Sequence, residues 1–350
     1  MGRKKRLKLS NRAGASLFRV SLGALAPRSK VAAVQTEPYA EMDQVSFPPL
    51  SRVVVSGGTH GNELSGAYIV RQMQKENSDQ TGSMSVCPIL NNPPAIDACR
   101  RYIDTDLNRC FTDALLNAQL TDTSPSELRR AHELNSLLGP KGSEGAVDLL
   151  CDLHNTTSNM GLCFILNVLD WIPLHIVKYV QNKMPSAPSR LIHTNATKSE
   201  GYSVDSVAKH GFAIEVGPQP HGVLRADVYN MMKEAVGHTL EWLNEFNTGT
   251  TFPGGEMEVF VREKAVDYPR DPESGTPAAV IHPELQDNDF KLLRHGDPMF
   301  KSFSGETLNY EGEDLYPFFI NECAYYEKHV AFCLAKRRTI TLPSIQVKET

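Results

Sequence analysis

The chain has no long apolar run, no Cys-x-x-Cys pair, no internal repeat and no excess of positive charge. Since no stretch approaches the ~18 consecutive apolar residues that span a bilayer, we expect no integral membrane segment. The formal net charge of −5 argues against a nucleic-acid partner. Seven cysteines, an odd number, favour reduced thiols and a cytoplasmic location over a disulfide framework. The remaining composition, 41% hydrophobic and 22% charged, is that of an ordinary globular protein.

The N-terminal segment differs from the rest of the chain. Residues 1–30 carry nine Lys or Arg and no acidic residue. We interpret residues 1–45 as a basic, disordered arm, and a mitochondrial transit segment is the alternative interpretation. The run Arg3-Lys4-Lys5-Arg6 would also suit a nuclear signal or a nucleic-acid contact. Met42 is an alternative start that would remove the arm.

Between residues 46 and 249, apolar β-branched runs alternate with segments of helical periodicity, which predicts an α/β domain. The predicted strands are residues 52–56, 85–90, 146–153, 162–168 and 211–216. The predicted helices are residues 63–75, 126–138, 172–184 and 228–246. In such folds ligands bind beyond the carboxyl ends of the strands, so polar residues at these ends are candidates for a site.

A Gly/Thr/Pro-rich stretch at residues 249–255 marks a change in composition. Beyond it, short β-like runs are separated by Pro, Gly and Asp, as at residues 257–261, 278–282, 316–320 and 330–333. We therefore predict a smaller β-rich domain over residues 250–350, which either shapes the cleft or covers an exposed face.

The strongest chemical signal is a His-x-x-Glu pair, His60 and Glu63, followed some ninety residues later by His154 at the end of an apolar strand. Two imidazoles and one carboxylate are the ligand set of a catalytic zinc, which leaves a fourth position for water. A single histidine is more often structural, but the glycines around His60 would let the backbone approach an ion closely. Asp152 is a candidate partner for His154.

Two further groups of residues carry chemistry. Arg101 and the stretch 104–109 would by default form a surface salt-bridge network. In the functional alternative, Arg109 and Asn108 bind a substrate carboxylate and Arg101 stabilises an oxyanion. Glu215 lies in an apolar strand, where an unpaired charge is costly. It is either a general base facing the metal or a structural partner of an arginine.

Several long segments resemble the aspartoacylase family of zinc carboxypeptidase-like hydrolases. The matching segments are residues 57–63, 101–109, 152–161, 215–220, 281–287 and 321–327. The resemblance runs from about residue 50 to about residue 335. It implies a mixed sheet flanked by helices, with a smaller β-rich C-terminal domain.

The resemblance also implies roles for individual residues. One Zn²⁺ per subunit would be held by His60, Glu63 and His154. Glu215 would be the base and Arg101 the carbonyl polariser. The substrate-binding residues would be Asn108, Arg109 and Tyr325 at the α-carboxylate, with Tyr202 and Asp205 beside them. The reaction would hydrolyse an amide and release a carboxylate and a free amino acid.

One segment bears on the substrate. Aspartoacylase has an arginine where this chain has Asp205, and a lysine where it has His329. Because an aspartate repels a second carboxylate, both changes argue against N-acetylaspartate. The segment resembles the aminoacylase-3 branch, which implies N-acyl aromatic amino acids and N-acetyl-cysteine S-conjugates (mercapturates) as substrates. The alternatives are an aspartoacylase and a zinc-binding protein without turnover. A small-molecule substrate and a homo-oligomer are expected.

Overall fold

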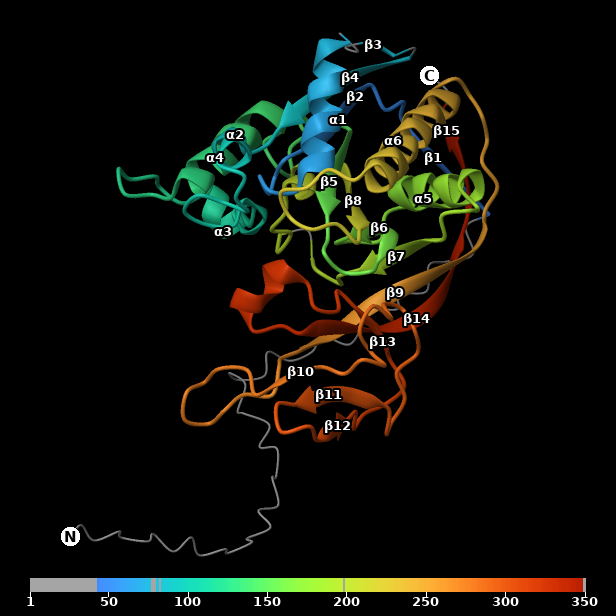
Figure 1. Ribbon diagram of the computed structural model, residues 1–350. Helices are drawn as coiled ribbons and strands as arrows, with labels where there is room; N and C mark the ends of the chain where they lie inside the picture. Colours follow the sequence, from blue (N-terminus) through green and yellow to red (C-terminus); the bar gives the residue numbers. More distant parts are fainter. Residues whose placement is uncertain (1–42, 77–79, 82, 198, 349–350) are drawn as a thin grey trace, which may run out of the picture. The chain divides into compact units, whose positions relative to one another are not determined.

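The computed structural model describes residues 43–76, 80–81, 83–197 and 199–348, which build a mixed sheet of ten strands (Figure 1). Its strands are, in spatial order, β13 (Tyr316–Phe318), β14 (Phe332–Leu342), β9 (Gly255–Val266), β7 (Ser189–His193), β6 (Gly161–Leu166), β8 (His210–Gly217), β5 (Leu149–Asn155), β2 (Arg52–Gly57), β4 (Met84–Leu90) and β3 (Gln80–Thr81). The strands β4, β2, β5 and β8 are parallel, whereas β6 runs antiparallel to β8. The predicted mixed sheet with flanking helices is confirmed.

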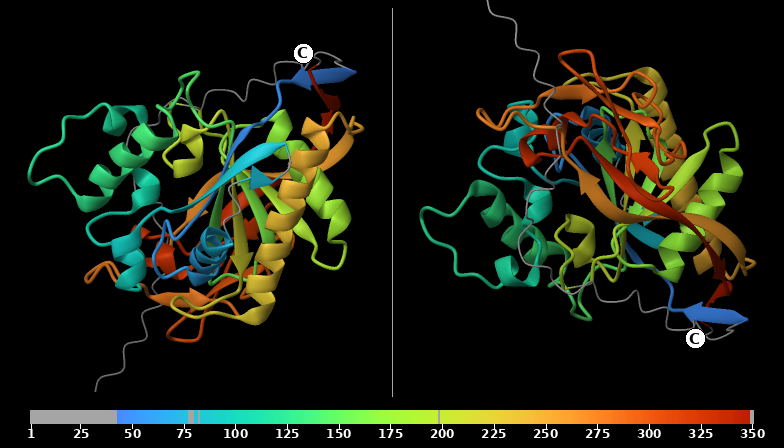
Figure 2. Two further views of the ribbon diagram at one scale, coloured as in Figure 1. Left: turned by 90° about the horizontal axis from the view of Figure 1, so that it is seen from above. Right: turned by 90° about the horizontal axis from the view of Figure 1, so that it is seen from below.

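The helices that cover one face of the sheet are α1 (Leu64–Lys75), α5 (Trp171–Lys183) and α6 (Ala226–Asn247). Figures 1 and 2 show α5 and α6 side by side on this face. Alternate side chains of each strand join the core beneath them, as Leu149, Cys151 and Leu153 of β5 do. This alternation follows from the two-residue period of a strand.

The opposite face of the sheet is divided between two smaller clusters. The helix α4 (Ser126–Leu138) packs Leu134 against Val54 of β2 and Leu150 of β5. Toward the other edge, an aromatic cluster of the C-terminal region packs against β7 and β9, and it includes Phe318. The site lies on this divided face, because His154 and Glu215 alternate with residues of the helix-covered face.

The C-terminal region is rich in strands, as predicted, but β9 and β14 extend the main sheet and do not build a separate one. A three-stranded sheet of β10 (Ala279–Ile281), β11 (Pro298–Ser302) and β12 (Thr307–Asn309) lies beyond them. Residues 43–348 all belong to one compact unit. The proposed boundary between residues 249 and 250 stays a prediction.

The predicted basic arm falls almost entirely outside the described residues, as does Met42. Within the described part, β1 (Gln44–Phe47) pairs in parallel with β15 (Ser344–Val347), so regular structure begins inside the last residues assigned to the arm. All seven cysteines lie in the described residues and none forms a disulfide. No helix of the described residues is long and apolar enough to cross a membrane.

The remaining helical segments are short and mostly precede or follow the strands of the site. These are α2 (Pro93–Asp97), α3 (Asp113–Leu116), and the 3₁₀ segments η1 (Leu107–Arg109), η2 (Val204–Val207) and η3 (Cys323–Lys328). They were not predicted, since three to six residues carry too little periodicity to read from sequence.

Candidate metal centre and cavity

The three predicted metal ligands come together at the carboxyl ends of β2 and β5. His60 lies in the loop after β2, Glu63 immediately precedes α1, and His154 is the penultimate residue of β5. The loop is tight: a Cβ on Gly61 would lie 1.9 Å from the Ala95 backbone, so this position requires glycine. Glu63 makes no capping hydrogen bond with its side chain, which leaves its carboxylate free to turn toward the histidines.

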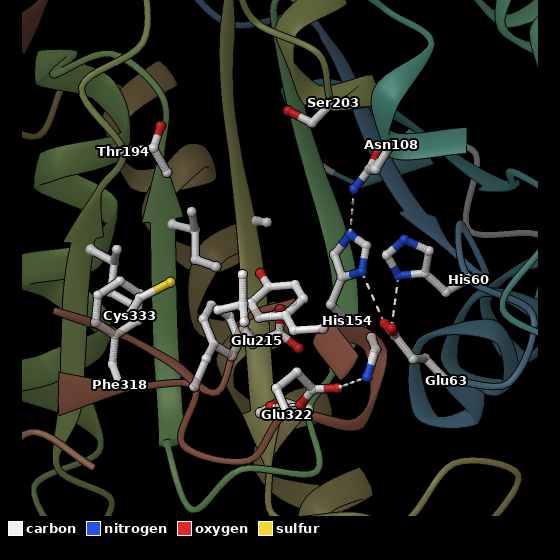
Figure 3. Close-up of a pocket in the computed structure, with 18 of the residues that line it drawn as sticks. His60, Glu63, Asn108, His154, Thr194, Ser203, Glu215, Phe318, Glu322 and Cys333 are labelled. Carbon is white, nitrogen blue, oxygen red and sulfur yellow. Dashed lines mark hydrogen bonds and ion pairs between the residues drawn. The ribbon is translucent and has the colours of Figure 1, made fainter. Parts of the chain in front are cut away.

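The ligand atoms of these three buried residues lie within 4.8 Å of one another. Glu63 Oε1 lies 2.7 Å from His60 Nδ1, and Glu63 Oε2 lies 2.9 Å from His154 Nδ1 (Figure 3). His60 Nδ1 is buried and has no partner with hydrogen-bond geometry, despite this short distance. A nitrogen and a carboxylate oxygen that meet without a hydrogen bond between them suit a shared cation, and this donor set can hold one.

Asp152 orients His154 from the interior of the sheet. Its Oδ2 lies 2.6 Å from His154 Nε2. With Asp152 as the acceptor, the hydrogen is on Nε2, and the neutral ring that a metal requires then has its lone pair on Nδ1, toward Glu63. Ser56 Oγ and Asn91 Nδ2 donate to Asp152 Oδ1, at 2.7 and 3.1 Å. The predicted support of His154 by Asp152 is present in this geometry.

Asp106 does the same for His60, a role that sequence reasoning missed. Its Oδ1 lies 3.1 Å from His60 Nε2, while its Oδ2 accepts from Arg101 and from Lys328. Asp106 is only 5% exposed. The default interpretation of this segment as a surface salt-bridge network is therefore wrong for Asp106, although Asp104 is exposed. Spacing alone could not distinguish the two aspartates.

Glu215 faces the same cavity from β8, where it lies opposite His154 in the register of β5 and β8. No Arg or Lys of the described residues forms an ion pair with it, so the structural alternative of an arginine partner does not hold. Burial, and then the negative charge of Glu63, raise the pKa of Glu215 well above its ordinary value. A carboxylate of raised proton affinity at this position is suited to accept and return a proton.

Arg101 contacts the candidate ligand set of His60, Glu63 and His154, called the metal group below. Its guanidinium donates to Glu63 Oε1 and to Asp106 Oδ2, both at 3.1 Å, and its Nε is buried without a partner. The Gly61 N–H donates to the Arg101 carbonyl, which joins the Arg101 loop to the His60 loop. Two carboxylates thus hold the Arg101 side chain at the edge of the cavity.

The predicted carboxylate-binding residues all line the cavity, but they are not equally free. Asn108 is engaged through its Oδ1, which accepts from Val204 N–H, and its Nδ2 lies 3.2 Å from His154 Nε2. Arg109 forms no ion pair among the described residues, and its Cζ lies 4.4 Å from the centroid of the Tyr202 ring. Burial raises the pKa of Tyr325, which therefore stays a neutral O–H donor.

Asp205 lies in η2 and is 4% exposed. No cation of the described residues pairs with it. Burial raises its pKa to about 6, so it is an anion above neutral pH. His329, at the end of η3, is exposed and does not line the cavity.

Sequence reasoning missed two features of the cavity. The first is Glu322, which is buried and accepts from Thr157 N–H at 2.8 Å and from the Thr156 hydroxyl, so that it joins η3 to the end of β5. The second is an apolar lining, which no sequence pattern singles out because its residues come from distant strands. Its members include Ile165, Ile192, Ala213, Phe318, Val330 and Cys333.

Comparison with known proteins places these features in a family. Residues 49–243 match the succinylglutamate desuccinylase/aspartoacylase catalytic domain, and residues 255–337 match the AstE/AspA barrel-sandwich hybrid domain. The chain is 56% identical over 313 residues to N-acyl-aromatic-L-amino acid amidohydrolase (carboxylate-forming) B of Danio rerio, with 88% of this chain and 100% of that protein covered. It is 42% identical over 306 residues to aspartoacylase of Mus musculus, with 86% and 97% covered. A crystal structure of murine aminoacylase 3 aligns with a TM-score of 0.84 at 46% identity, covering 86% of this chain and 100% of that one.

Proposed function

We propose that this chain, which belongs to the succinylglutamate desuccinylase/aspartoacylase family, is a zinc-dependent amidohydrolase that deacylates N-acyl aromatic L-amino acids and N-acetyl-cysteine S-conjugates. The observation that carries the proposal is the convergence in one cavity of a His-Glu-His group, the general-base candidate Glu215, and Arg109, which forms no ion pair among the described residues. The N-acyl-aromatic amidohydrolase of Danio rerio is similar over its whole length, which supports the same class of reaction here.

His60, Glu63 and His154 would hold the Zn²⁺. When bound, zinc supplies a Lewis acid that polarises the acyl carbonyl and lowers the pKa of water to ~7. Three protein ligands leave a position open, as in catalytic rather than structural sites. A zinc-binding protein without turnover would have no use for that open position or for the proton acceptor beside it.

Glu215 would move the proton. It accepts one from the attacking water and gives it to the nitrogen of the leaving amino acid, so the carboxylate is regenerated in each cycle. Burial and the charge of Glu63 raise the pKa of Glu215 above its ordinary value, which strengthens its affinity for the proton of the attacking water. Arg101 would stabilise the negative charge that develops on the carbonyl oxygen, because its guanidinium is already oriented by Glu63 and Asp106.

Arg109 and Tyr325 would hold the substrate's α-carboxylate. Arg109 carries no competing ion pair among the described residues, and Tyr325 is a neutral donor. Asp205 would then disfavour a second carboxylate on the side chain, since it is a buried acid that pairs with no cation of the described residues. This supports an aromatic or thioether side chain over that of aspartate.

The test compares hydrolysis of N-acetyl-tyrosine, an N-acetyl-S-aryl-cysteine and N-acetyl-aspartate, with and without chelator. We expect turnover of the first two, loss of turnover with chelator, recovery on adding Zn²⁺, and little turnover of the third. Preference for N-acetyl-aspartate would overturn the substrate assignment alone. Turnover that resists complete metal removal would overturn the zinc mechanism. Bound zinc without hydrolysis of any of the three would favour a non-catalytic protein.

A further inference from the structure

The sheet wall of the cavity is built in parallel rows of side chains. In the first row, His154 of β5 lies opposite Glu215 of β8. Two residues back along β8, Ala213 lies opposite Ile165 of β6, and Ile165 lies opposite Ile192 of β7. Because side chains two apart share a face, this second row faces the cavity beside the first, about 7 Å away.

The second row is apolar. Ala213, Ile165 and Ile192 present only methyl and methylene groups to the cavity. Ala213 is the smallest of the three and is next to Glu215 on the same face of β8, so the wall is recessed there. Phe318 of β13, in the C-terminal region, also lines the cavity (Figure 3), and it belongs to the same packed cluster as Ile192. This region suits the flat face of an aromatic ring.

The next row is polar. Thr194 and Asn167 follow Ile192 and Ile165 by two residues, and Thr194 Oγ1 donates to Asn167 Oδ1 at 2.9 Å. The corresponding residue of β8 is Gly211, and Asp205 lies over it, because a Cβ there would meet the Asp205 carbonyl oxygen at 2.1 Å. Asp205 thus takes the place of a β8 side chain in this row. From Glu215 to Gly211, β8 rises by about 13 Å.

Asp205 has spare capacity to accept hydrogen bonds. The Ser203 hydroxyl donates to the Asp205 side chain. Asn167 Nδ2 approaches Asp205 Oδ2 at only 3.4 Å, because the same amide group donates to Ser203 Oγ at 2.8 Å. Asp205 is 4% exposed and lines the cavity, yet it pairs with no Lys or Arg of the described residues. A carboxylate offers about four acceptor sites, and a buried one is costly unless donors fill them.

We infer that Asp205 recognises a hydrogen-bond donor at the tip of the substrate's side chain, so that N-acyl-tyrosine is preferred over N-acyl-phenylalanine. The inference rests on the proposed function and adds to it a residue that determines specificity. The ring lies over Ala213, Ile165 and Ile192, and its para hydroxyl donates to the Asp205 carboxylate. The other end of the substrate is held at the metal group.

The experiment measures kcat/KM for N-acetyl-tyrosine, N-acetyl-phenylalanine and N-acetyl-O-methyl-tyrosine. We expect the full chain with zinc to prefer tyrosine over phenylalanine by about tenfold, the usual effect of a hydrogen bond to a charged acceptor. The O-methyl compound, which keeps the ring and loses the donor, should behave like phenylalanine. Asp205→Leu, which keeps the branched shape and removes the acceptor, should reduce the tyrosine-to-phenylalanine ratio to near one.

Asp170→Leu is the matched control. Asp170 caps α5 and pairs with His210, outside the cavity that holds the metal group. It should leave the ratio unchanged, and zinc content and Tm show whether either variant is folded. The inference would be overturned, and the proposed function left intact, if the unmodified protein hydrolysed N-acetyl-tyrosine and N-acetyl-phenylalanine with equal kcat/KM. The same holds if Asp205→Leu left the tyrosine-to-phenylalanine ratio unchanged. Absence of turnover of all three substrates would instead count against the proposed function.

An N-acetyl-4-carboxy-phenylalanine substrate distinguishes Asp205 from the other charged group near this row. Arg262 of β9 lines the cavity two residues beyond Phe260, which lies opposite Ile192. If Asp205 governs the tip, the carboxylate analogue should be the poorest substrate, because two anions would meet. If it proves the best, Arg262 governs the tip and the assignment to Asp205 is wrong.

Discussion

Replacing Asp152 by asparagine tests whether the support behind His154 controls metal binding. Asp152 is fully buried and lies 2.6 Å from His154 Nε2. Its other contacts are donors: Ser56 Oγ at 2.7 Å, Thr59 Oγ1 at 2.9 Å and Asn91 Nδ2 at 3.1 Å. An asparagine keeps one acceptor oxygen, but its NH₂ group replaces the other and meets a donor, either Asn91 Nδ2 or the Nε2–H of His154.

The size of the effect follows from those contacts. Loss of a hydrogen-bond partner behind a metal-binding histidine weakens metal affinity by ~10–100-fold, or about 1.4–2.7 kcal/mol. The metal-free protein should also lose about 1–3 kcal/mol of its free energy of unfolding, because at least one buried donor is left without an acceptor. Both effects should appear together, since one side chain serves both the ligand and the core.

The assay is competition for Zn²⁺ against a chelator of known affinity, with Tm measured in parallel. Asp148→Asn is the control: Asp148 immediately precedes β5, is buried, and accepts from Ser51 N–H and Lys209 at 2.9 Å, away from the metal group. It should lower Tm without changing zinc affinity. If Asp152→Asn binds zinc as tightly as the unmodified protein, the argument that Asp152 orients His154 is refuted.

Three further predictions follow from the same structure. Glu215→Gln should lower kcat by ~10²–10⁴-fold with zinc content unchanged, and an activity above a tenth of normal would exclude Glu215 as the proton acceptor. Asp205→Arg should raise kcat/KM for N-acetyl-aspartate relative to N-acetyl-tyrosine by at least about tenfold, measured with the two substrates in parallel; an unchanged ratio would refute the charge argument. Burial raises the pKa of Asp289 from 3.8 to about 7. The folded protein therefore holds a proton that the unfolded chain releases, and stability falls as pH rises from about 4 to about 7. Because asparagine does not titrate, Asp289→Asn should remove this loss of unfolding free energy, which is up to about 4 kcal/mol. The Tm of the variant relative to the unmodified protein should therefore rise between pH 4 and pH 8. A Tm difference that is constant over this range would contradict the raised pKa of Asp289.

The central elements of the fold were predictable because they are long and periodic. The helix at residues 126–138 agrees with α4 at both ends, and residues 52–56 agree with β2 to within one residue. Strand β7, which pairs with both β6 and β9, was missed because Ser189–His193 is short and only its last three residues are buried. The sequence indicated a separate β-rich domain, but β9 and β14 continue the main sheet, since hydrogen bonding between strands is not visible in local composition.

The metal group was predictable from residue types and their place at strand ends. Its supporting residues were only half predictable. Asp152 precedes His154 by two residues in one strand, so a shared face could be inferred, whereas Asp106 reaches His60 from a loop 46 residues away. Nothing in the spacing of residues 104 and 106 shows that one aspartate is exposed and the other buried. The difference becomes visible only in the folded chain, where Asp106 contacts His60 and Arg101 in the interior.

In the proposed mechanism, the strand β8 serves both chemistry and selectivity. Glu215, Ala213 and Gly211 share one face, and their side chains decrease from a carboxylate to a methyl group to none. The reacting group is fixed at the carboxyl end of the strand, and the decreasing size opens space along it that another segment, η2 with Asp205, can close. If the inference about Asp205 holds, a substitution in η2 changes the residue that meets the substrate's side chain and leaves the position of Glu215 unaltered. Members of a family built this way can differ in substrate without a change in the metal group or the proton acceptor, which is why Asp205 rather than any ligand is the residue to vary first.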